Sequence, residues 1–193
     1  MAQSKGSVWP RIAYACGTFG HDVFYAMLAT YFMIFVTSNL FNSGNPTHDQ
    51  YMIGIVTTII LVLRIAELFV DPFIGNIIDK TKTRWGRFKP WVIVGAFVAA
   101  ISLAALFTDF GGLAASSPTT YLILFAIVYF IMDIFYSAKD VAIWSMIPAL
   151  SFDSHEREIT ATVARIGSVF GANLVTVIVM PVVLYFSVNQ NGG

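Results

Sequence analysis

Three ionisable side chains, Arg64, Glu67 and Asp71, lie within one of the most apolar stretches of the chain. In a helix, which turns about 100° per residue, Glu67 lies about 60° and Asp71 about 20° from Arg64, so the three share one narrow stripe. An ionisable side chain near the middle of a bilayer costs on the order of 2.5–3.5 kcal/mol. If this stretch crosses a membrane, its stripe requires mutual pairing or a polar pathway, and we expect the chemistry to be there.

A second group lies further along the chain, where Tyr136, Asp140 and Trp144 follow one another at intervals of four residues. This spacing places them on one face of a helix. A carboxylate flanked by flat rings suits a sugar, because sugar hydroxyls donate to the acid while a C–H face stacks on a ring. Aromatic residues at helical spacing also pack without binding anything, so this alternative stays open.

The composition indicates which elements position these side chains. Charged residues make up 11% of the 193 residues, hydrophobic residues 57%, and the mean hydropathy is +0.74. A soluble domain carries about a quarter charged residues, so the sequence predicts an all-α membrane protein. Five apolar segments are long enough to cross about 30 Å of hydrocarbon. They cover approximately residues 11–40, 51–78, 90–108, 119–150 and 160–187.

Smaller features refine this arrangement. The first segment is too long for the apolar part of a signal peptide, so we expect it to be a retained helix. The spacing Gly167-x-x-x-Gly171 predicts a close helix approach. Pro72 leaves a backbone carbonyl without its helical donor and permits a bend beside Asp71. Because Cys16 is the only cysteine, no internal disulfide or cysteine-based metal cluster is expected.

The distribution of Lys and Arg predicts the orientation. The connection between the second and third segments holds Lys80, Lys82, Arg84, Arg87 and Lys89, whereas the connections 42–50 and 109–118 hold none. By the positive-inside rule the N-terminus is expected to be cytoplasmic. In that orientation Glu67, Asp71, Asp140 and Asp22 are expected at one level, just cytoplasmic of the bilayer midpoint.

Acids outnumber bases within the predicted spans. Five acids stand against two bases that lie well inside the spans; the acids are Asp22, Glu67, Asp71, Asp133 and Asp140, and the bases are Arg64 and Lys139, while Arg11 and Arg165 lie at span ends. Some of these acids must be protonated, bind a cation or pair with groups outside the chain. Structural ion pairs are the alternative, but they would tend to balance the charge. The excess of acids is typical of a cation-coupled transporter.

Several motifs resemble one known family. Asp71-Pro72-x-x-Gly75 followed by Arg84-Trp-Gly-Arg-Phe-Lys-Pro-Trp91 is similar to the signature of the glycoside–pentoside–hexuronide:cation symporters, which belong to the major facilitator superfamily. Tyr136-Ser-Ala-Lys-Asp140-Val-Ala-Ile-Trp144-Ser and Asp153-Ser-His-Glu-Arg-Glu158 add a second match. The resemblance covers essentially the whole chain and is strongest to the members of the family that transport lactose-type galactosides.

The resemblance implies roles for individual residues. It implies a cytoplasmic gate at Asp79, Arg84 and Arg87. It also implies cation coupling by Glu67, Asp71 and Lys139. A sodium-using member has Asp where this chain has Glu67, which favours a proton over sodium as the coupling ion. The residues expected to bind or adjoin the sugar are Asp22, Arg64, Tyr136, Asp140 and Trp144.

The family's twelve helices form two halves of six, so residues 1–193 are expected to form most of an N-terminal six-helix bundle. Expected partners are a galactoside, the lipid bilayer and a C-terminal half outside this chain; no nucleic acid, metal or cofactor is expected. The predicted function is galactoside:cation symport or lactose/galactose exchange. A non-transporting remnant or an associating subunit is the alternative, as is a helical channel. No Cys, His or Ser constellation indicates an enzyme.

Overall fold

The computed structural model describes residues 8–41, 45–150 and 153–190, and no strand occurs in these ranges. Among the described residues, five helices are long and apolar enough to cross a membrane, as predicted. The chain divides into two compact units, Met1–Ala29 with Ile147–Gly193 and Thr30–Met146. Each unit is described by itself.

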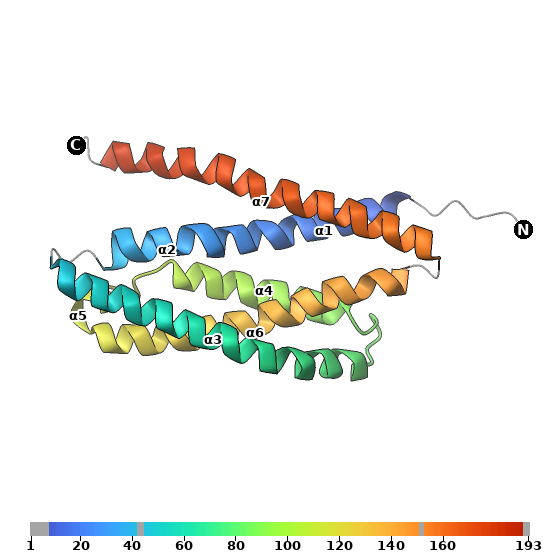
Figure 1. Cartoon of the computed structure of the whole chain (residues 1–193), viewed down its shortest axis with the longest axis horizontal. Helices are drawn as coiled ribbons and strands as arrows, with labels where there is room; N and C mark the ends of the chain where they lie inside the picture. The colour runs from blue at the N-terminus through green and yellow to red at the C-terminus, as the bar shows by residue number, and fades with distance from the viewer. Residues whose placement is uncertain (1–7, 42–44, 151–152, 191–193) are drawn as a thin grey trace, which may run out of the picture. The chain divides into compact units, whose positions relative to one another are not determined.

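The first unit consists mainly of α1 (Val8–Ala26) and α7 (Ser154–Gln190), which pack along each other (Figure 1). A Cβ atom added to Gly167 would lie 2.6 Å from the Ala15 carbonyl oxygen, and one added to Gly171 would collide with the Phe19 carbonyl. The close approach predicted from these two glycines is therefore confirmed, and it involves α1.

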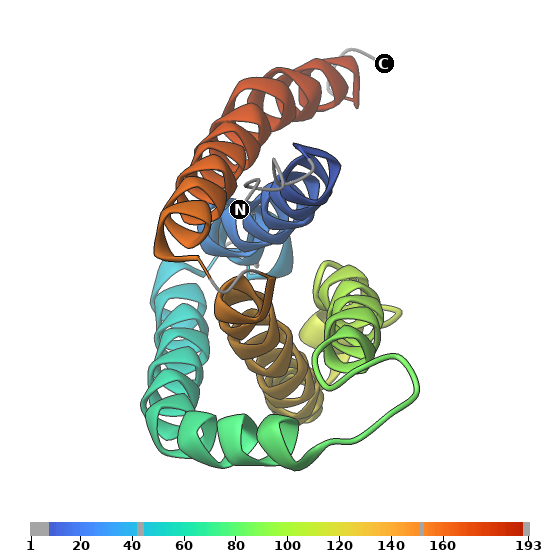
Figure 2. The same ribbon diagram turned by 90° about the vertical axis from the view of Figure 1, so that its right-hand side faces the viewer.

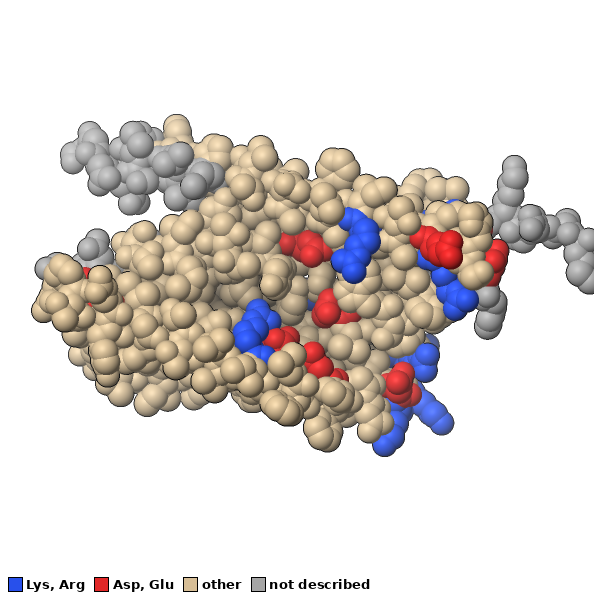
Figure 3. Space-filling model, viewed as in Figure 1, with Lys and Arg blue, Asp and Glu red and all other residues tan. Residues whose placement is uncertain are grey.

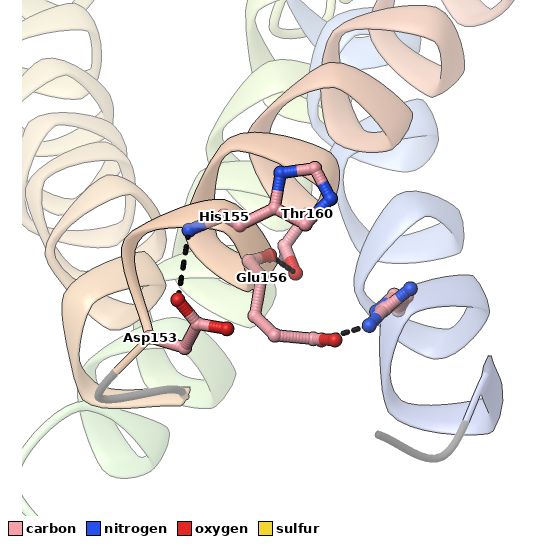
Figure 4. A network of polar contacts seen from close by, with 5 residues as sticks. Asp153, His155, Glu156 and Thr160 are labelled. Carbon is pink, nitrogen blue, oxygen red and sulfur yellow. Dashed lines mark hydrogen bonds and ion pairs between the residues drawn. The ribbon is translucent and has the colours of Figure 1, made fainter. Parts of the chain in front are cut away.

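The beginning of α7 is fixed by polar contacts (Figure 4). Asp153 Oδ1 accepts a hydrogen bond of 3.1 Å from the His155 backbone N–H, as an N-cap residue does. Glu156, an acid in the first turn of α7, pairs with Arg11 of α1. Because of this cap and favourable acid, α7 begins at Ser154, before the position near 160 that the apolar pattern predicts.

The second unit begins at Thr30, within the π-helical turn η1 (Met27–Tyr31). The short helix α2 (Phe32–Phe35) and a second π-helical turn, η2 (Val36–Leu40), follow. Then come α3 (Pro46–Lys80), α4 (Lys89–Leu106), the short α5 (Leu113–Ser116) and α6 (Pro118–Leu150). Within this unit α3, α4 and α6 run lengthwise beside one another (Figure 1), and the view along the helices shows α6 between α3 and α4 (Figure 2).

Two helix positions differ from the sequence prediction. The helix α3 starts at Pro46, about one turn before the predicted residue 51, because proline suits the first turn of a helix. The predicted turn at 42–46 falls partly outside the described residues, since 42–44 are not described. The connection 109–118 contains α5, which a polarity pattern does not reveal because four residues are too few.

The core of the second unit consists of stacked rings and of contacts between α3 and α6. Phe32 and Phe125 stack with their centroids 5.6 Å apart, and Phe32 also meets Phe107 edge to face at 5.8 Å. Further along, Ile74 and Ile78 of α3 share a buried cluster with small residues of α6. This cluster fixes α3 against α6 just beyond the ionisable stripe.

The outer face of α3 carries large apolar side chains, among them Leu68, Phe69 and Phe73, each about 70% exposed. An apolar face of this kind suits lipid. In the space-filling view, charged atoms gather part-way along the helices and near one end, between long surfaces without charge (Figure 3).

Candidate functional site

The ionisable stripe of α3 is paired both within the helix and across to α6. Arg64 Nη1 donates a hydrogen bond of 2.8 Å to Glu67 Oε2, one turn along the same helix. The same nitrogen lies 3.3 Å from Asp133 Oδ1 of α6. A single guanidinium thus faces two carboxylates. This pairing offsets part of the free energy needed to place these ionisable side chains in an apolar helix.

Asp71, the third member of the stripe, points into a small pocket between α3 and α6. Ser137 of α6 donates a hydrogen bond from its hydroxyl to Asp71 Oδ1. Glu67 and Asp133 line the same pocket, beside apolar side chains. Its volume of about 10 Å³ is about that of one water-sized sphere. The pocket therefore has room for a proton relay through water or for a small cation, and it is too small for a sugar.

The polar and aromatic residues of α6 form two separate contacts. Trp144 Nε1 donates a hydrogen bond of 2.8 Å to Asp140 Oδ1, and both side chains are half-buried. Lys139 Nζ lies 4.4 Å from the centroid of the Tyr136 ring, and both of these residues are buried. The Tyr136 ring therefore supports the Lys139 ammonium, a cation–π contact, while Trp144 orients Asp140.

Lys139 is separate from the pocket between α3 and α6. On α6 it lies about 120° around the helix from Asp133. Its backbone and Cβ instead lie close to Gly95 of α4, where an added Cβ would come within 2.8 Å of the Lys139 Cβ. Of the three predicted cation-coupling residues, the structure brings Glu67 and Asp71 into one pocket and places Lys139 outside its lining.

Asp22 belongs to the first unit, so the predicted common level of Asp22 with the acids of the second unit stays a prediction. On α1 the side chain is half-buried, and its Oδ2 atom is buried without a hydrogen-bond partner among the described residues. A buried carboxylate oxygen that lacks a donor is a candidate acceptor for a ligand hydroxyl.

The predicted gate residues lie at the end of α3 and in the connection that follows. Arg87 Nη1 lies 3.5 Å from Asp79 Oδ1, and half or more of each side chain is exposed. Arg87 also lies over the Phe88 ring, 4.6 Å from its centroid. Arg84 is exposed in the same connection. Exposed ion pairs contribute little stability, so the Asp79–Arg87 pair is easily broken and remade.

Asp133 is one of the acids within the predicted spans, but neither Asp133 nor Ser137 is among the predicted site residues. Both line the pocket with Glu67 and Asp71. The available signal was their spacing: residues four apart on a helix lie about 40° apart, so Asp133 and Ser137 share a face that also includes Asp140.

Comparisons with known proteins identify the family of this chain. Residues 13–193 match the family described as MFS/sugar transport protein. A lactose permease from Lactobacillus delbrueckii subsp. bulgaricus is 57% identical over 191 residues, which are 97% of this chain and 30% of that permease. A raffinose carrier protein from Pediococcus pentosaceus is 56% identical over 177 residues, which are 92% of this chain and 28% of that carrier. A lactose permease from Leuconostoc lactis is 41% identical over 189 residues, with 98% of this chain and 30% of that permease covered.

The chain thus spans about 30% of the length of the curated relatives it matches. The match to the family covers nearly all of the chain and includes most or all of each described helix that is long enough to cross a membrane. The chain is a multi-pass membrane protein, and the family that it matches is one of transporters rather than of enzymes. The chain belongs to the MFS/sugar transport protein family.

Proposed function

We propose that the chain forms the N-terminal part of a galactoside:cation symporter that works by alternating access. The observation that supports this most directly is the separation of two polar sites in one helical unit. One is the oriented Asp140–Trp144 pair, and the other is the water-sized pocket at Glu67, Asp71 and Asp133. A symporter needs one site for its sugar and another for its coupling ion.

The sugar site is assigned to Asp140 and Trp144, with Arg64 and Tyr136 of the same unit near the sugar. The part in sugar binding that the sequence predicts for Asp22, a residue of the other unit, stays a prediction. Relatives of this chain are named for lactose and for raffinose, and both of these sugars contain a galactosyl unit. The hydroxyls of that unit would donate to Asp140, and the indole of Trp144 would offer a flat apolar face for its C–H groups. The hydrogen bond between them fixes the carboxylate relative to the ring.

The coupling site is assigned to Glu67 and Asp71. Lys139, which the sequence also predicts to take part in coupling, lies outside the lining of their pocket. The pocket holds three acids against the single guanidinium of Arg64, so it would attract a proton or a small cation. We favour a proton because Glu67 stands where a sodium-using member of the family has Asp. Binding of the cation would neutralise the excess charge and allow the loaded site to reorient; the same machinery would support lactose/galactose exchange.

The remaining parts of the proposal concern topology and partners. The N-terminus is assigned to the cytoplasm, because the end of α3, the connection after it and the start of α4 together hold five Lys and Arg residues. The Asp79–Arg87 pair at that end would open and close with the transport cycle, as part of a gate that also includes Arg84. The second wall of the transport pathway would come from a C-terminal half outside this chain, as the length of the relatives supports.

A chimera tests the proposed function. The matching N-terminal part of the Lactobacillus delbrueckii lactose permease is replaced by this chain, and uptake of radiolabelled lactose is measured in cells that lack other lactose transport. We expect uptake by the chimera and none after Asp140→Asn, with equal amounts of both proteins in the membrane. A chimera that inserts and is abundant but takes up no galactoside would support the alternative, a non-transporting remnant.

A further inference from the structure

We propose that Asp133 is a positioning residue of the coupling site. Asp133 shares the Arg64 guanidinium with Glu67 and thereby allows Glu67 to take up a proton. The inference rests on the proposed cation coupling and adds a third carboxylate, from α6, to the two on α3. Asp133 does not itself need to bind the proton. Its role is to offer the Arg64 guanidinium a second carboxylate partner.

The geometry around Arg64 is asymmetric. Arg64 Nη1 makes a hydrogen bond of 2.8 Å to Glu67 Oε2, whereas it approaches Asp133 Oδ1 to 3.3 Å. That Asp133 oxygen is buried and has no hydrogen-bond partner among the described residues. Glu67 therefore holds the bond to the guanidinium, and Asp133 is an unsatisfied acceptor beside the same nitrogen.

The burial of Asp133 makes its contact with Arg64 energetically important. The residue is only 4% exposed, and a buried carboxylate without a compensating partner is strongly unfavourable. Within the second unit, the charged and titratable groups that face Glu67 and Asp133 are Arg64 and Asp71 from α3 and Tyr129 from α6. Arg64 is the only cation among these groups, so the acids compete for it.

This competition connects proton uptake to a change of partner. When Glu67 takes a proton, its ion pair with Arg64 is lost, and the guanidinium is free to satisfy the adjacent Asp133 oxygen. Without Asp133, protonation of Glu67 would leave Arg64 half-buried beside a neutral residue, which is costly. Asp133 thus lowers the cost of the protonated state of Glu67, and it does so through Arg64 rather than by direct contact.

The test uses the 193-residue chain itself, reconstituted in lipid nanodiscs. Dicyclohexylcarbodiimide, an apolar reagent that reacts with protonated carboxyl groups, is added at one near-neutral pH, and modification of Glu67 is followed by peptide mass spectrometry. We expect Asp133→Asn to slow this modification on the order of tenfold, the usual size of the effect of one nearby charge. Asp133→Glu should restore the rate, and Arg64→Gln should raise it above that of the unchanged chain.

The opposite signs of the two substitutions separate positioning from structural damage. A helix bundle that merely loosened would expose Glu67 and raise its modification in both variants, and that result would overturn the proposal. An unchanged rate in Asp133→Asn would also overturn it. The matched control is Asp109→Asn, which should leave the rate unchanged. Asp109 lies between α4 and α5, and its carboxylate accepts a hydrogen bond from the Ala114 backbone N–H. None of these readouts depends on sugar transport, so failure of the chimera and failure of this inference are distinguishable.

Discussion

The Ser137 hydroxyl donates a hydrogen bond to Asp71 Oδ1 and so joins α6 to α3 at the wall of the small pocket. This contact brings a neutral oxygen and carboxylates from two helices around a space of about 10 Å³. A proton and a sodium ion would use the hydroxyl differently. The Ser137 oxygen would be a ligand of a bound sodium ion. A proton would bind a carboxylate instead, and the hydroxyl would act only as a hydrogen-bond donor to Asp71.

Substitution Ser137→Ala therefore distinguishes the two coupling ions. With proton coupling, Asp71 loses a hydrogen-bond donor, so the pH profile of lactose uptake by the chimera should change while no dependence on sodium appears. With sodium coupling, loss of a ligand should raise the half-maximal sodium concentration about tenfold. Uptake measured against pH and against sodium decides between them. Ser145→Ala, an exposed serine of α6, is the control; no change in either profile would remove Ser137 from the site.

The bond between Trp144 and Asp140 leads to a second prediction. Trp144→Phe keeps an aromatic ring but removes the Nε1 donor that orients the carboxylate at 2.8 Å. Hydrogen bonds to charged groups contribute about 1.5–3 kcal/mol, so the KM for lactose uptake by the chimera should rise at least tenfold. Trp9→Phe, at a 75% exposed position on α1, should leave the KM unchanged. If Trp144→Phe leaves the KM as unchanged as Trp9→Phe does, the Trp144 indole contributes only packing and does not orient Asp140 for sugar binding.

The sequence was sufficient to predict the helices and the residues of α3 that need partners, because both follow from hydrophobicity and from one helical period. Arg64 and Glu67 are three residues apart, and their pairing follows from that spacing. The partners contributed by α6 were not predictable in this way. Which face of α6 turns towards α3 depends on packing between residues more than sixty positions apart, such as Asp71 and Ser137.

The face of α6 that Tyr136 and Asp140 share also has contacts that helical spacing does not predict. Both residues lie on one side of α6 as the spacing predicts, yet the Tyr136 ring is covered by the Lys139 ammonium at 4.4 Å. A helical period places Cβ atoms but does not determine where a long lysine side chain ends. The α1–α7 contact was predictable in kind, since Gly167 and Gly171 indicate a close approach, while the partner helix was not.

That helix contact allows a prediction about stability. In Gly167→Ala the new Cβ would lie 2.6 Å from the Ala15 carbonyl oxygen, so α1 must move away from α7. Overpacking of this kind costs about 1–3 kcal/mol, and the thermal unfolding midpoint of the purified chain should fall. Gly54→Ala on α3, where nothing lies within 4 Å of the added atom, should be neutral or slightly stabilising because alanine favours helix. Equal midpoints for the two variants would contradict the close approach.

The proposed orientation predicts which connections face the cytoplasm. Cys16 is first replaced by Ser, since it is the only cysteine, and single cysteines are then introduced at Thr83, in the basic connection after α3, or at Ser116, at the end of α5. Both positions are exposed. A membrane-impermeant maleimide added to intact cells should label Ser116→Cys and should label Thr83→Cys only after the membrane is opened. Because the five basic residues near Thr83 favour the cytoplasmic side, labelling of Thr83→Cys in intact cells would reverse the topology and, with it, the assignment of Asp79 and Arg87 to a cytoplasmic gate.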